Sequence, residues 1–426
     1  MKRLNGIRLP LRKKTEDKPV AALPLPQYVR IPMLMHRGTP CVPTVEPDDY
    51  VTVGQVIGKP ADDMAVPIHA SVSGTVTAIT DYTLPDGNVV PCIEIESDGS
   101  QTVSRSCRPP QLNNREDLIN AAKESGCVGC SGSGYLTYQK LAASDKFTML
   151  IVNGAESEPY LTADCRLMVE TPDDVIGGIA LIMKLLKIKE ARIGIQTDKP
   201  AAIRLMSDAA EKQKGISVIP LPPLYPQGAE KVMIFHTCGV IVPEGKTSAD
   251  CGILELNVGT CAFLYRYSQT GIPLTERVVT VAGSAVGSPA NLRVPVGTPV
   301  TDLLDECSCD YDKMHELLCG GPMMGQAIAN AEDAVILRQQ NALLARKGRE
   351  FPEPSACMRC GACMKACPLN LMPTEIDRAF EQRDLRTLKQ LHTGLCMNCG
   401  SCTYVCPAHR PLAETVTRAK AAIAQD

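Results

Sequence analysis

The chain of 426 residues has no tryptophan, only 5 phenylalanines and no surplus of positive charge, with a formal net charge of −3. Proteins that bind nucleic acids need a dense basic face or aromatic side chains on which bases can stack, so this composition argues against that class. Basic residues gather only at Arg12, Lys13 and Lys14. We expect this short run to belong to a solvated N-terminal arm.

Long apolar runs are also missing. A membrane-spanning helix needs about 20 consecutive apolar residues. The best candidate, residues 175–189, is shorter and is interrupted by Lys184, so we expect a buried helix there. The N-terminus lacks the apolar segment of a signal peptide. We therefore expect a cytoplasmic protein with no transmembrane segment of its own, a result that still allows a peripheral position on the inner face of the cell membrane.

The chain is too long for one compact core, and its sequence pattern changes several times. Residues 1–27 are rich in proline and lysine and predict an extended arm. Residues 28–108 alternate short valine-rich runs with Gly, Pro and Asp, which predicts a small β-sandwich. This stretch resembles a lipoyl-like barrel-sandwich module, but it lacks a lysine at the exposed hairpin position that a swinging-arm carrier requires. A structural or docking role is the better interpretation.

Residues 109–270 alternate between helical and extended patterns. We expect helices at 115–126, 171–189 and 200–215, and strands at 146–157, 190–197 and 216–222. This order predicts a layered α/β domain with a mainly parallel sheet. Ligands of such sheets bind at the carboxyl ends of the strands, which draws attention to Asn153, Glu156 and Glu158.

Two further domains complete the predicted fold, a multidomain α/β and β architecture. Residues 271–330 return to short strands and turns followed by a helix, which suits a small β-grasp (SLBB-like) unit. Residues 332–348 predict a helix, or a strand and a helix, that leads into a C-terminal helical domain at 331–426.

The cysteines are distributed unevenly. Of the 20, twelve are scattered through the first 319 residues and eight fall in two compact runs, "CMRCGACMKACP" at 357–368 and "CMNCGSCTYVCP" at 396–407. A disulfide framework is not expected in a cytoplasmic protein. Each run reads C-x2-C-x2-C-x3-C-P, in which three thiolates bind one [4Fe–4S] cluster and the fourth binds the other. The predicted ligand sets are Cys357, Cys360, Cys363 and Cys406 for one cluster, and Cys396, Cys399, Cys402 and Cys367 for the other.

Paired zinc knuckles are the alternative, because zinc also binds four thiolates. A zinc site requires neither the third cysteine of each run nor the trailing Pro368 and Pro407, which favours the clusters. The segment between the runs, 369–395, has a helical pattern, so we predict a helical dicluster ferredoxin domain. Two such clusters indicate one-electron transfer rather than bond-making chemistry.

A Cys-x-x-Cys pair overlaps a glycine-rich loop in "SGCVGCSGSGYLTYQK", residues 125–140. The loop follows a predicted helix rather than a strand, so it is not the βαβ dinucleotide fingerprint. A tight turn between helices and a thiol or metal site at Cys127 and Cys130, with Cys165, remain open at this point. One-electron transfer from a two-electron donor such as NADH usually needs a flavin.

The same loop resembles, without gaps, the "VGxGGAGFPTxxK" loop of two related flavoprotein families. They are the NADH-oxidising, FMN-binding subunit of respiratory complex I and the C subunit of the Rnf ferredoxin:NAD+ oxidoreductase. "NGAESEPYLTADCR" (153–166), "YPQGAEK" (225–231) and "LNVGT" (256–260) resemble further pieces of the same flavin site, in the same order. The barrel-sandwich module, the β-grasp unit, "GGPMMG" (320–325) and the two cysteine runs follow the order of the Rnf C subunit, so the resemblance covers nearly the whole chain.

The resemblance implies a role for each matching residue. The loop glycines would offer N–H groups to the FMN phosphate, with Lys140 meeting the phosphate or the flavin edge, and Tyr135 would stack on NADH. Four polar residues would hydrogen-bond the isoalloxazine and ribityl chain, and two glutamates would line the nicotinamide pocket. The residues are, in that order, Gly129, Gly132 and Gly134; Asn153, Glu156, Asn257 and Thr260; and Glu158 and Glu230.

Several residues depart from the family pattern, among them Ser131, Ser133 and Leu136 in the loop, Ser157 and Cys165. We expect a divergent member that passes electrons between NAD(H), FMN and two [4Fe–4S] clusters. Its partner would be the Rnf membrane complex, a ferredoxin or a soluble reductase. The alternative is a non-catalytic iron–sulfur relay or scaffold whose flavin site has degenerated.

Overall fold

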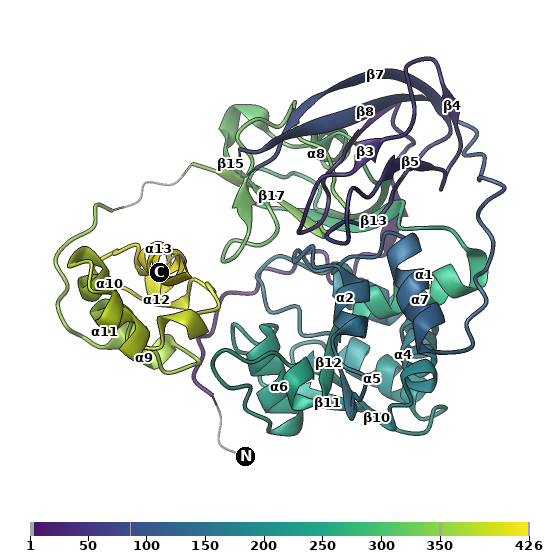
Figure 1. Cartoon of the computed structure of the whole chain (residues 1–426). Coiled ribbons are helices and arrows are strands. Elements are labelled where there is room, and N and C mark those ends of the chain that lie inside the picture. Colours follow the sequence, from purple (N-terminus) through teal and green to yellow (C-terminus); the bar gives the residue numbers. More distant parts are fainter. Residues whose placement is uncertain (1–3, 86, 349–351, 425–426) are drawn as a thin grey trace.

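The computed structural model describes residues 4–85, 87–348 and 352–424. Two small sheets form the N-terminal β domain, in the strand orders β2-β8-β7-β4 and β3-β5-β6 (Figure 1). Alternate residues such as Val29, Ile31, Ile93 and Ile95 meet in one buried core, so the predicted β-sandwich is confirmed. The strands are β2 Tyr28–Pro32, β3 Val42–Pro43, β4 Tyr50–Val51, β5 Val56–Lys59, β6 Ile68–His69, β7 Gly74–Thr83 and β8 Val89–Ser97.

The α/β domain is built on four parallel strands in the order β11-β10-β9-β12. They are β9 Met149–Asn153, β10 Glu190–Gln196, β11 Ile216–Leu221 and β12 Ile253–Asn257. The side chains of β9 point alternately to the two faces of the sheet. Leu150 and Val152 join the core formed with most of the helices, whereas Ile151 packs under α6. The predicted parallel sheet is confirmed.

Helices cover both faces of this sheet (Figure 1). Each expected helix is present, and α4 is the buried helix predicted for the longest apolar run, with seven buried residues. No helix in the described ranges is long and apolar enough to cross a membrane. The helices are α1 Arg115–Glu124, α2 Thr137–Ala142, α3 Ala163–Glu170, α4 Pro172–Leu186, α5 Pro200–Ala210, α6 Glu230–Cys238, α7 Val258–Thr270 and the short η1 Ala249–Cys251.

A third, six-stranded sheet has the order β1-β14-β13-β17-β15-β16. Its central strands β13 and β17 are parallel, and β14 and β15 pair with them in antiparallel fashion. Together with α8 this is the strand order of a β-grasp fold. The elements are β1 Val20–Ala22, β13 Glu276–Ala282, β14 Ala290–Pro295, α8 Val300–Glu306, η2 Tyr311–Lys313, β15 Met314–Cys319, β16 Gln326–Ala327 and β17 Ala342–Lys347.

The β-grasp sheet extends beyond the range 271–330 in both directions along the chain. Strand β1 comes from the N-terminal arm, and β17 lies in the segment for which a helix, or a strand and a helix, is predicted. That helix prediction is wrong. Residues Ala342–Ala345 are all buried because β17 is central in its sheet, so the run has no alternation that could distinguish a strand from a buried helix.

The C-terminal domain consists of short helices around a small core that includes Ile376, Leu388 and Val416. It forms a separate lobe (Figure 1). The predicted helical segment between the cysteine runs is confirmed. The helices are α9 Ala362–Ala366, α10 Pro373–Glu381, α11 Leu385–Gln390, η3 Thr393–Leu395, α12 Ser401–Tyr404 and α13 Leu412–Ala424.

The N-terminal arm packs against three of these domains. Its backbone pairs with Tyr225 at Ile7 and with β14 at β1, and Asn5 bonds Asn370 of the C-terminal domain. The prediction of a solvated basic run is wrong for Lys13, because only 3 % of its side chain is exposed. The described part of the arm, residues 4–27, therefore packs as part of the folded structure.

Candidate functional site

A cavity of about 680 Å³ lies where the carboxyl ends of β9 and β12 meet the β domain and the β-grasp sheet. Its size is typical of a pocket for a small molecule or cofactor. Every flavin and nicotinamide residue suggested by the sequence lines it, and these residues come from separate parts of the α/β domain. They are Gly129, Gly132, Gly134, Tyr135, Lys140, Asn153, Glu156, Glu158, Glu230, Asn257 and Thr260.

The glycine-rich loop has a hydrogen-bonding pattern different from the one the resemblance implies. The amide of Gly129 donates to Tyr135 O (2.9 Å) and that of Gly132 to Gln339 O (2.9 Å). These two amides are therefore engaged within the protein. Among the described residues, the amides of Ser131, Ser133 and Gly134 make no hydrogen bond. They are the donors that the loop leaves for an anion.

The β domain supplies a cation beside this loop. The amide of Arg37 donates to Gly134 O (2.8 Å), and the Arg37 side chain is exposed and lines the cavity. Arg37 forms no ion pair within the described part of the chain. Loop amides next to an arginine form an arrangement suited to a phosphate group.

Lys140 sits among carboxylates. Its Nζ donates to Glu255 Oε2 (2.7 Å) and to Glu255 O (3.1 Å), and lies 3.7 Å from Glu230 Oε2. Burial opposes the charge on Lys140, but Glu255 and Glu230 outweigh it, so the pKa is raised. Asn153 Nδ2 bonds the other oxygen of Glu255 (3.1 Å). Lys140 is therefore held as a charged group at the cavity wall.

Asn257 and Thr260 lie at the start of α7. Asn257 caps the helix by accepting from Gly259 N (2.7 Å), and its Nδ2 donates to Asp164 Oδ2 (2.7 Å). The hydroxyl of Thr260 accepts from Cys130 N (3.4 Å), which ties the glycine-rich loop to this helix. Tyr135 is exposed at the cavity, with its ring centroid 6.0 Å from Lys140 Nζ. An exposed ring in this position is free to stack on a planar ligand.

The side chain of Glu156, for which the resemblance implies a bond to the flavin, is engaged within the protein. Only 1 % of its side chain is exposed, and its carboxylate accepts from Asp164 N (2.8 Å) and Cys165 N (3.3 Å) at the start of α3. Lys13 Nζ donates to the backbone carbonyl of Glu156 (2.8 Å). Glu156 thus lines the cavity mainly through its backbone, and the side chain organises the wall behind it.

Glu158 is a carboxyl of the cavity wall whose ionisation is suppressed mainly by burial. Its Oε2 accepts from Met323 N (3.1 Å), while its Oε1 is buried with no hydrogen-bond partner among the described residues. Burial raises the pKa of Glu158 to about 7, although the amides of Met323 and Met324 act in the opposite direction. Near neutral pH this group can therefore hold or release a proton at the cavity wall.

We expect Glu158→Gln to stabilise the protein increasingly as the pH rises from 5 to 8. Above about pH 4.5 the unfolded chain ionises Glu158, whereas the folded chain resists ionisation up to about pH 7. The wild type loses stability across this window, on the order of 2 kcal/mol, and the amide variant does not. The measurement is the difference in melting temperature between the two proteins at a series of pH values. A difference that stays constant with pH would contradict the assignment.

The Cys-x-x-Cys pair lies in the core. Cys127 and Cys130 are fully buried, and their thiols donate to Thr137 Oγ1 (3.4 Å) and Val128 O (3.4 Å). Burial raises the pKa of Cys127 well above its ordinary value, and it raises that of Cys165 to about 12. Buried thiols of this kind are inert apolar groups, which argues against a thiol function for these three cysteines.

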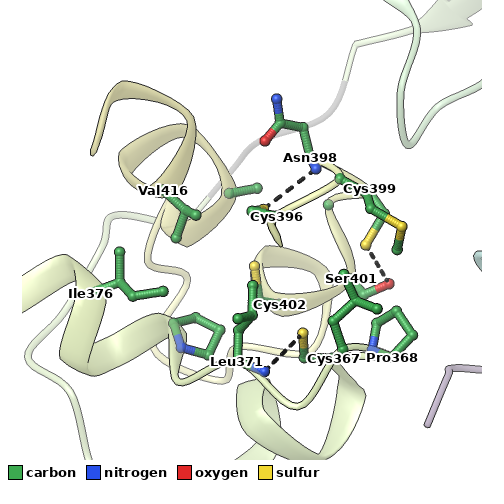
Figure 2. A pocket seen from close by; sticks show the side chains of 15 residues that line it. Cys367, Pro368, Leu371, Ile376, Cys396, Asn398, Cys399, Ser401, Cys402 and Val416 are labelled. Carbon is green, nitrogen blue, oxygen red and sulfur yellow. Dashed lines mark hydrogen bonds between the residues drawn. The ribbon is translucent and has the colours of Figure 1, made fainter. Parts of the chain in front are cut away.

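The second cysteine run forms one pocket with Cys367, as the sequence predicts. Cys367, Cys396, Cys399 and Cys402 surround the same space, which apolar residues such as Ile376 and Val416 also line (Figure 2). Backbone amides donate to two of the sulfurs, from Leu371 to Cys367 Sγ and from Asn398 to Cys396 Sγ, both at 3.4 Å. Amide donors around thiolates in an apolar pocket fit an iron–sulfur cluster.

The first run lies nearer to solvent. Cys357 and Cys360 are exposed, Cys363 is buried and Cys406 is partly buried. Ser355 N donates to Ala408 O (2.9 Å), which brings the start of this run beside the end of the second. Arg359 N donates to Cys357 Sγ (3.4 Å), the same amide–sulfur contact as in the other site. Within the described ranges, no group of three or more His, Cys, Asp or Glu is placed to hold a single metal ion.

Several residues at the cavity were not suggested by the sequence. Most of them reach it from distant parts of the chain or lie within otherwise ordinary strands and loops, so no local motif marks them. Asp164 lies in the "NGAESEPYLTADCR" segment, which resembles the flavin site, but it was not named as a site residue. The "YPQGAEK" segment pointed to the neighbourhood of Tyr225 without naming it. They are Lys13 behind the wall, and Arg37, Asp164, Tyr225, Glu255 and Gln339 in the lining.

Three family models match the chain. Residues 2–100 match the RnfC barrel sandwich hybrid domain, 122–266 the Nuo51 FMN-binding domain, and 356–409 the 4Fe-4S dicluster domain. The chain thus has an FMN-binding domain and a dicluster domain, and the zinc interpretation of the cysteine runs is set aside. The predicted barrel-sandwich module is confirmed.

Named relatives match over most of the chain. The C subunit of the proton-translocating ferredoxin:NAD(+) oxidoreductase complex of Clostridium ljungdahlii is 38% identical over 88% of this chain and 83% of its own. The C subunit of the Na(+)-translocating ferredoxin:NAD(+) oxidoreductase complex of Acetobacterium woodii is 35% identical over 89% of this chain and 87% of its own.

A likeness to a solved structure concerns the fold alone. The air-oxidized NAD+-reducing [NiFe]-hydrogenase matches with a TM-score of 0.50 and 14% identity, over 74% of this chain and 64% of that chain, which is less than two thirds of its length. The identity of the two bacterial relatives over most of their length, together with the order of the three matched domains, shows that the chain belongs to the RnfC family, the C subunits of the Rnf ferredoxin:NAD+ oxidoreductase complexes.

Proposed function

We propose that this chain exchanges electrons between NAD(H) and a partner redox protein, using FMN in the 680 Å³ cavity and [4Fe–4S] clusters at the two cysteine sites. The observation that carries the proposal is the convergence of all eleven flavin and nicotinamide residues on one cavity. A bound flavin would supply the chemistry that converts a two-electron donor into single electrons. The chain's own residues would bind, orient and shield it.

The charges around the cavity suggest which end holds the phosphate. Gly134, in the same loop as Ser131, contacts Arg37, whereas the cavity wall at Lys140 carries Glu230 and Glu255. A phosphate group is favoured at the first end and repelled by the carboxylates at the other. Tyr135 and Glu158 would then be left for the nicotinamide, with Asn153, Asn257 and Thr260 for the flavin ring and its ribityl chain.

The partner is also a matter of proposal. The relatives belong to ion-translocating complexes, and we propose that this chain likewise assembles with other redox proteins at a membrane. A ferredoxin or a soluble reductase are the other candidate partners. Isolation of the tagged chain from its own cells, with identification of the proteins that co-purify, distinguishes these three cases.

The experiment that tests the proposed chemistry is cofactor analysis of the anaerobically purified protein, followed by titration with NADH. We expect FMN, iron and sulfide to be present, and the flavin absorbance to bleach on addition of NADH. Ser133→Asp places a negative charge in the phosphate loop and should lower FMN retention by about tenfold or more. Ser133→Asn, which has the same shape without the charge, should retain it.

The cluster content should be the same in both variants because Ser133 lies in the α/β domain, far along the chain from the cysteine runs. Iron and sulfide without any flavin, even after incubation with FMN, would refute the proposal and favour the relay or scaffold role.

A further inference from the structure

We propose that electrons pass between the cavity and the cluster site of Cys367, Cys396, Cys399 and Cys402 first, beside Tyr225, and reach the site of Cys357, Cys360, Cys363 and Cys406 second. We call these the inner and the outer cluster site. The inference rests on the proposed function and adds the order of the two clusters and the residue that joins the inner site to the cavity.

Tyr225 touches both the cavity and the inner site. It lines the cavity, only 3 % of the residue is exposed, and its hydroxyl donates to the backbone carbonyl of Cys399 (2.6 Å). Its own backbone is fixed by two hydrogen bonds to Ile7, from Ile7 N to Tyr225 O (2.9 Å) and from Tyr225 N to Ile7 O (2.8 Å). A buried tyrosine hydroxyl needs a hydrogen-bond partner, and here that partner is the cysteine loop itself.

A second wall of the cavity, the segment 320–325, contacts the same cysteine loop at the residue after Cys399. Met323 lies in the segment 320–325, most of which lines the cavity, and its amide is bonded to Glu158. Gly400, which follows Cys399, packs so closely here that an added Cβ would lie 3.1 Å from Met323 O. Gly400 has a φ of +75°, so only a residue without a side chain fits this approach easily. Two walls of the cavity thus contact adjacent residues of the inner site.

The remaining contacts of the C-terminal domain lie on the same side. Within the described residues, three side-chain hydrogen bonds join it to the rest of the chain. Besides Tyr225–Cys399 they are Asn5–Asn370 (2.8 Å) and His392–Glu244 (2.5 Å). Asn370 follows Cys367, and His392 precedes Cys396. The domain therefore docks through the segments that carry the inner ligands, and these are the segments shown in Figure 2.

The outer cluster site is exposed to solvent, whereas the inner site faces the rest of the chain. Cys357 and Cys360 are exposed, and so is Met358 between them, at 63 %. Electron tunnelling weakens steeply with distance, so the docked cysteine set is the one that can exchange electrons with the cavity. The exposed set is the one that a partner protein can approach. The order cavity, inner site, outer site follows.

The electron count is simple. NADH loses two electrons and becomes NAD+ with the release of a proton, and each cluster accepts one electron at a time. The inner site then passes its electron to the outer site and can be reduced again. Nothing beyond NADH and the terminal acceptor is consumed.

The test removes one ligand from each site in turn and follows reduction of the remaining cluster by electron paramagnetic resonance. In Cys360→Ala the inner cluster should still be reduced by NADH. In Cys399→Ala the outer cluster should be reduced by dithionite but at least about tenfold more slowly by NADH. Equal reduction of the remaining cluster by NADH in both variants, or the reverse pattern, would overturn the proposed order.

Tyr225→Phe keeps the ring and removes only the hydrogen bond. We expect unchanged iron content, and reduction of the clusters slowed relative to bleaching of the flavin by NADH by up to about tenfold, which is what a lost hydrogen bond allows. Tyr267→Phe, at a buried tyrosine of α7 whose ring stacks on Phe263, is the matched control and should leave both rates unchanged. Wild-type cluster reduction in Tyr225→Phe would remove Tyr225 from the route.

These outcomes separate the inference from the function on which it rests. If the wild-type flavin does not bleach with NADH, the proposed function fails. If it bleaches and the two cysteine variants behave alike, only the order of the clusters fails. If Cys399→Ala loses both clusters, the test is the rate of cluster reduction in Tyr225→Phe compared with that in its control Tyr267→Phe.

Discussion

Lys13→Met should lower the free energy of unfolding by on the order of 3–5 kcal/mol and reduce FMN retention. Lys13 Nζ donates to the carbonyls of Glu156 (2.8 Å) and Leu161 (2.7 Å) and lies 3.7 Å from Glu156 Oε2. Methionine fills a similar space but leaves two buried carbonyls without a donor and the Glu156 carboxylate without its cation. Thermal unfolding and the ratio of FMN to protein after gel filtration measure the two effects.

We expect lower FMN retention in Lys13→Met because Lys13 holds Glu156 in its position at the cavity wall. Its backbone lines the cavity with a φ of +43°, a conformation that is unfavourable for a residue with a side chain. Lys13 and the amides at the start of α3 hold it there. Without Lys13 this part of the wall can relax, and the cavity loses its shape.

Lys14→Met is the matched control for this prediction. Lys14 is the next residue along the same arm and is exposed, so its replacement should change the free energy of unfolding by less than about 0.5 kcal/mol. Similar melting temperatures for the two methionine variants would show that the arm does not support the cavity.

Lys13 shows which parts of the site can be predicted from the sequence and which cannot. The cysteine runs and the glycine-rich loop were readable because a cluster or a turn fixes the spacing of neighbouring residues. Lys13 acts on Glu156, 143 residues away, and in the sequence it stands in a basic run that is typical of a solvated arm. Only the folded chain reveals that one member of the run is buried.

For the glycine-rich loop, the sequence indicates where the loop lies but not which partners its amides bond. The residues that the resemblance singles out line one cavity, but the amides of Gly129 and Gly132, which it assigns to a phosphate, bond Tyr135 O and Gln339 O. Gln339 comes from the segment between β16 and β17 of the β-grasp sheet. A loop motif fixes the local backbone, whereas the partners of its amides depend on which distant segment packs against it.

The extent of the β-grasp sheet could not be predicted for a related reason. Strand β17 is buried on both faces, and β1 is three residues long in a proline-rich arm. Neither has the alternation of a half-buried strand, so each is recognisable only through its partner, β13 for β17 and β14 for β1. Secondary structure that depends on tertiary pairing leaves little trace in the local sequence.

Gly178→Ala should destabilise the α/β domain by on the order of 2 kcal/mol, although alanine is the better helix former. Gly178 is buried in α4, where an added Cβ would lie 1.9 Å from the backbone oxygen of Cys261 in α7. Backbone cannot move aside as a side chain can, so the two helices must separate. Because α7 begins at the cavity with Asn257 and Thr260, we also expect earlier release of the flavin on heating, which flavin fluorescence measures.

Gly177→Ala provides a control at the preceding residue of the same helix. There an added Cβ would meet the ring of Tyr265 at 2.7 Å, and this ring belongs to a half-buried side chain that can swing away. The gain in helix propensity, up to about 1 kcal/mol, then offsets the contact, so the melting temperature should change little or rise. A larger loss in Gly177→Ala than in Gly178→Ala would mean that backbone contact between α4 and α7 does not limit the packing of this domain. A larger loss in Gly178→Ala than in Gly177→Ala would show that the backbone contact between α4 and α7 holds the start of α7 in place at the cavity.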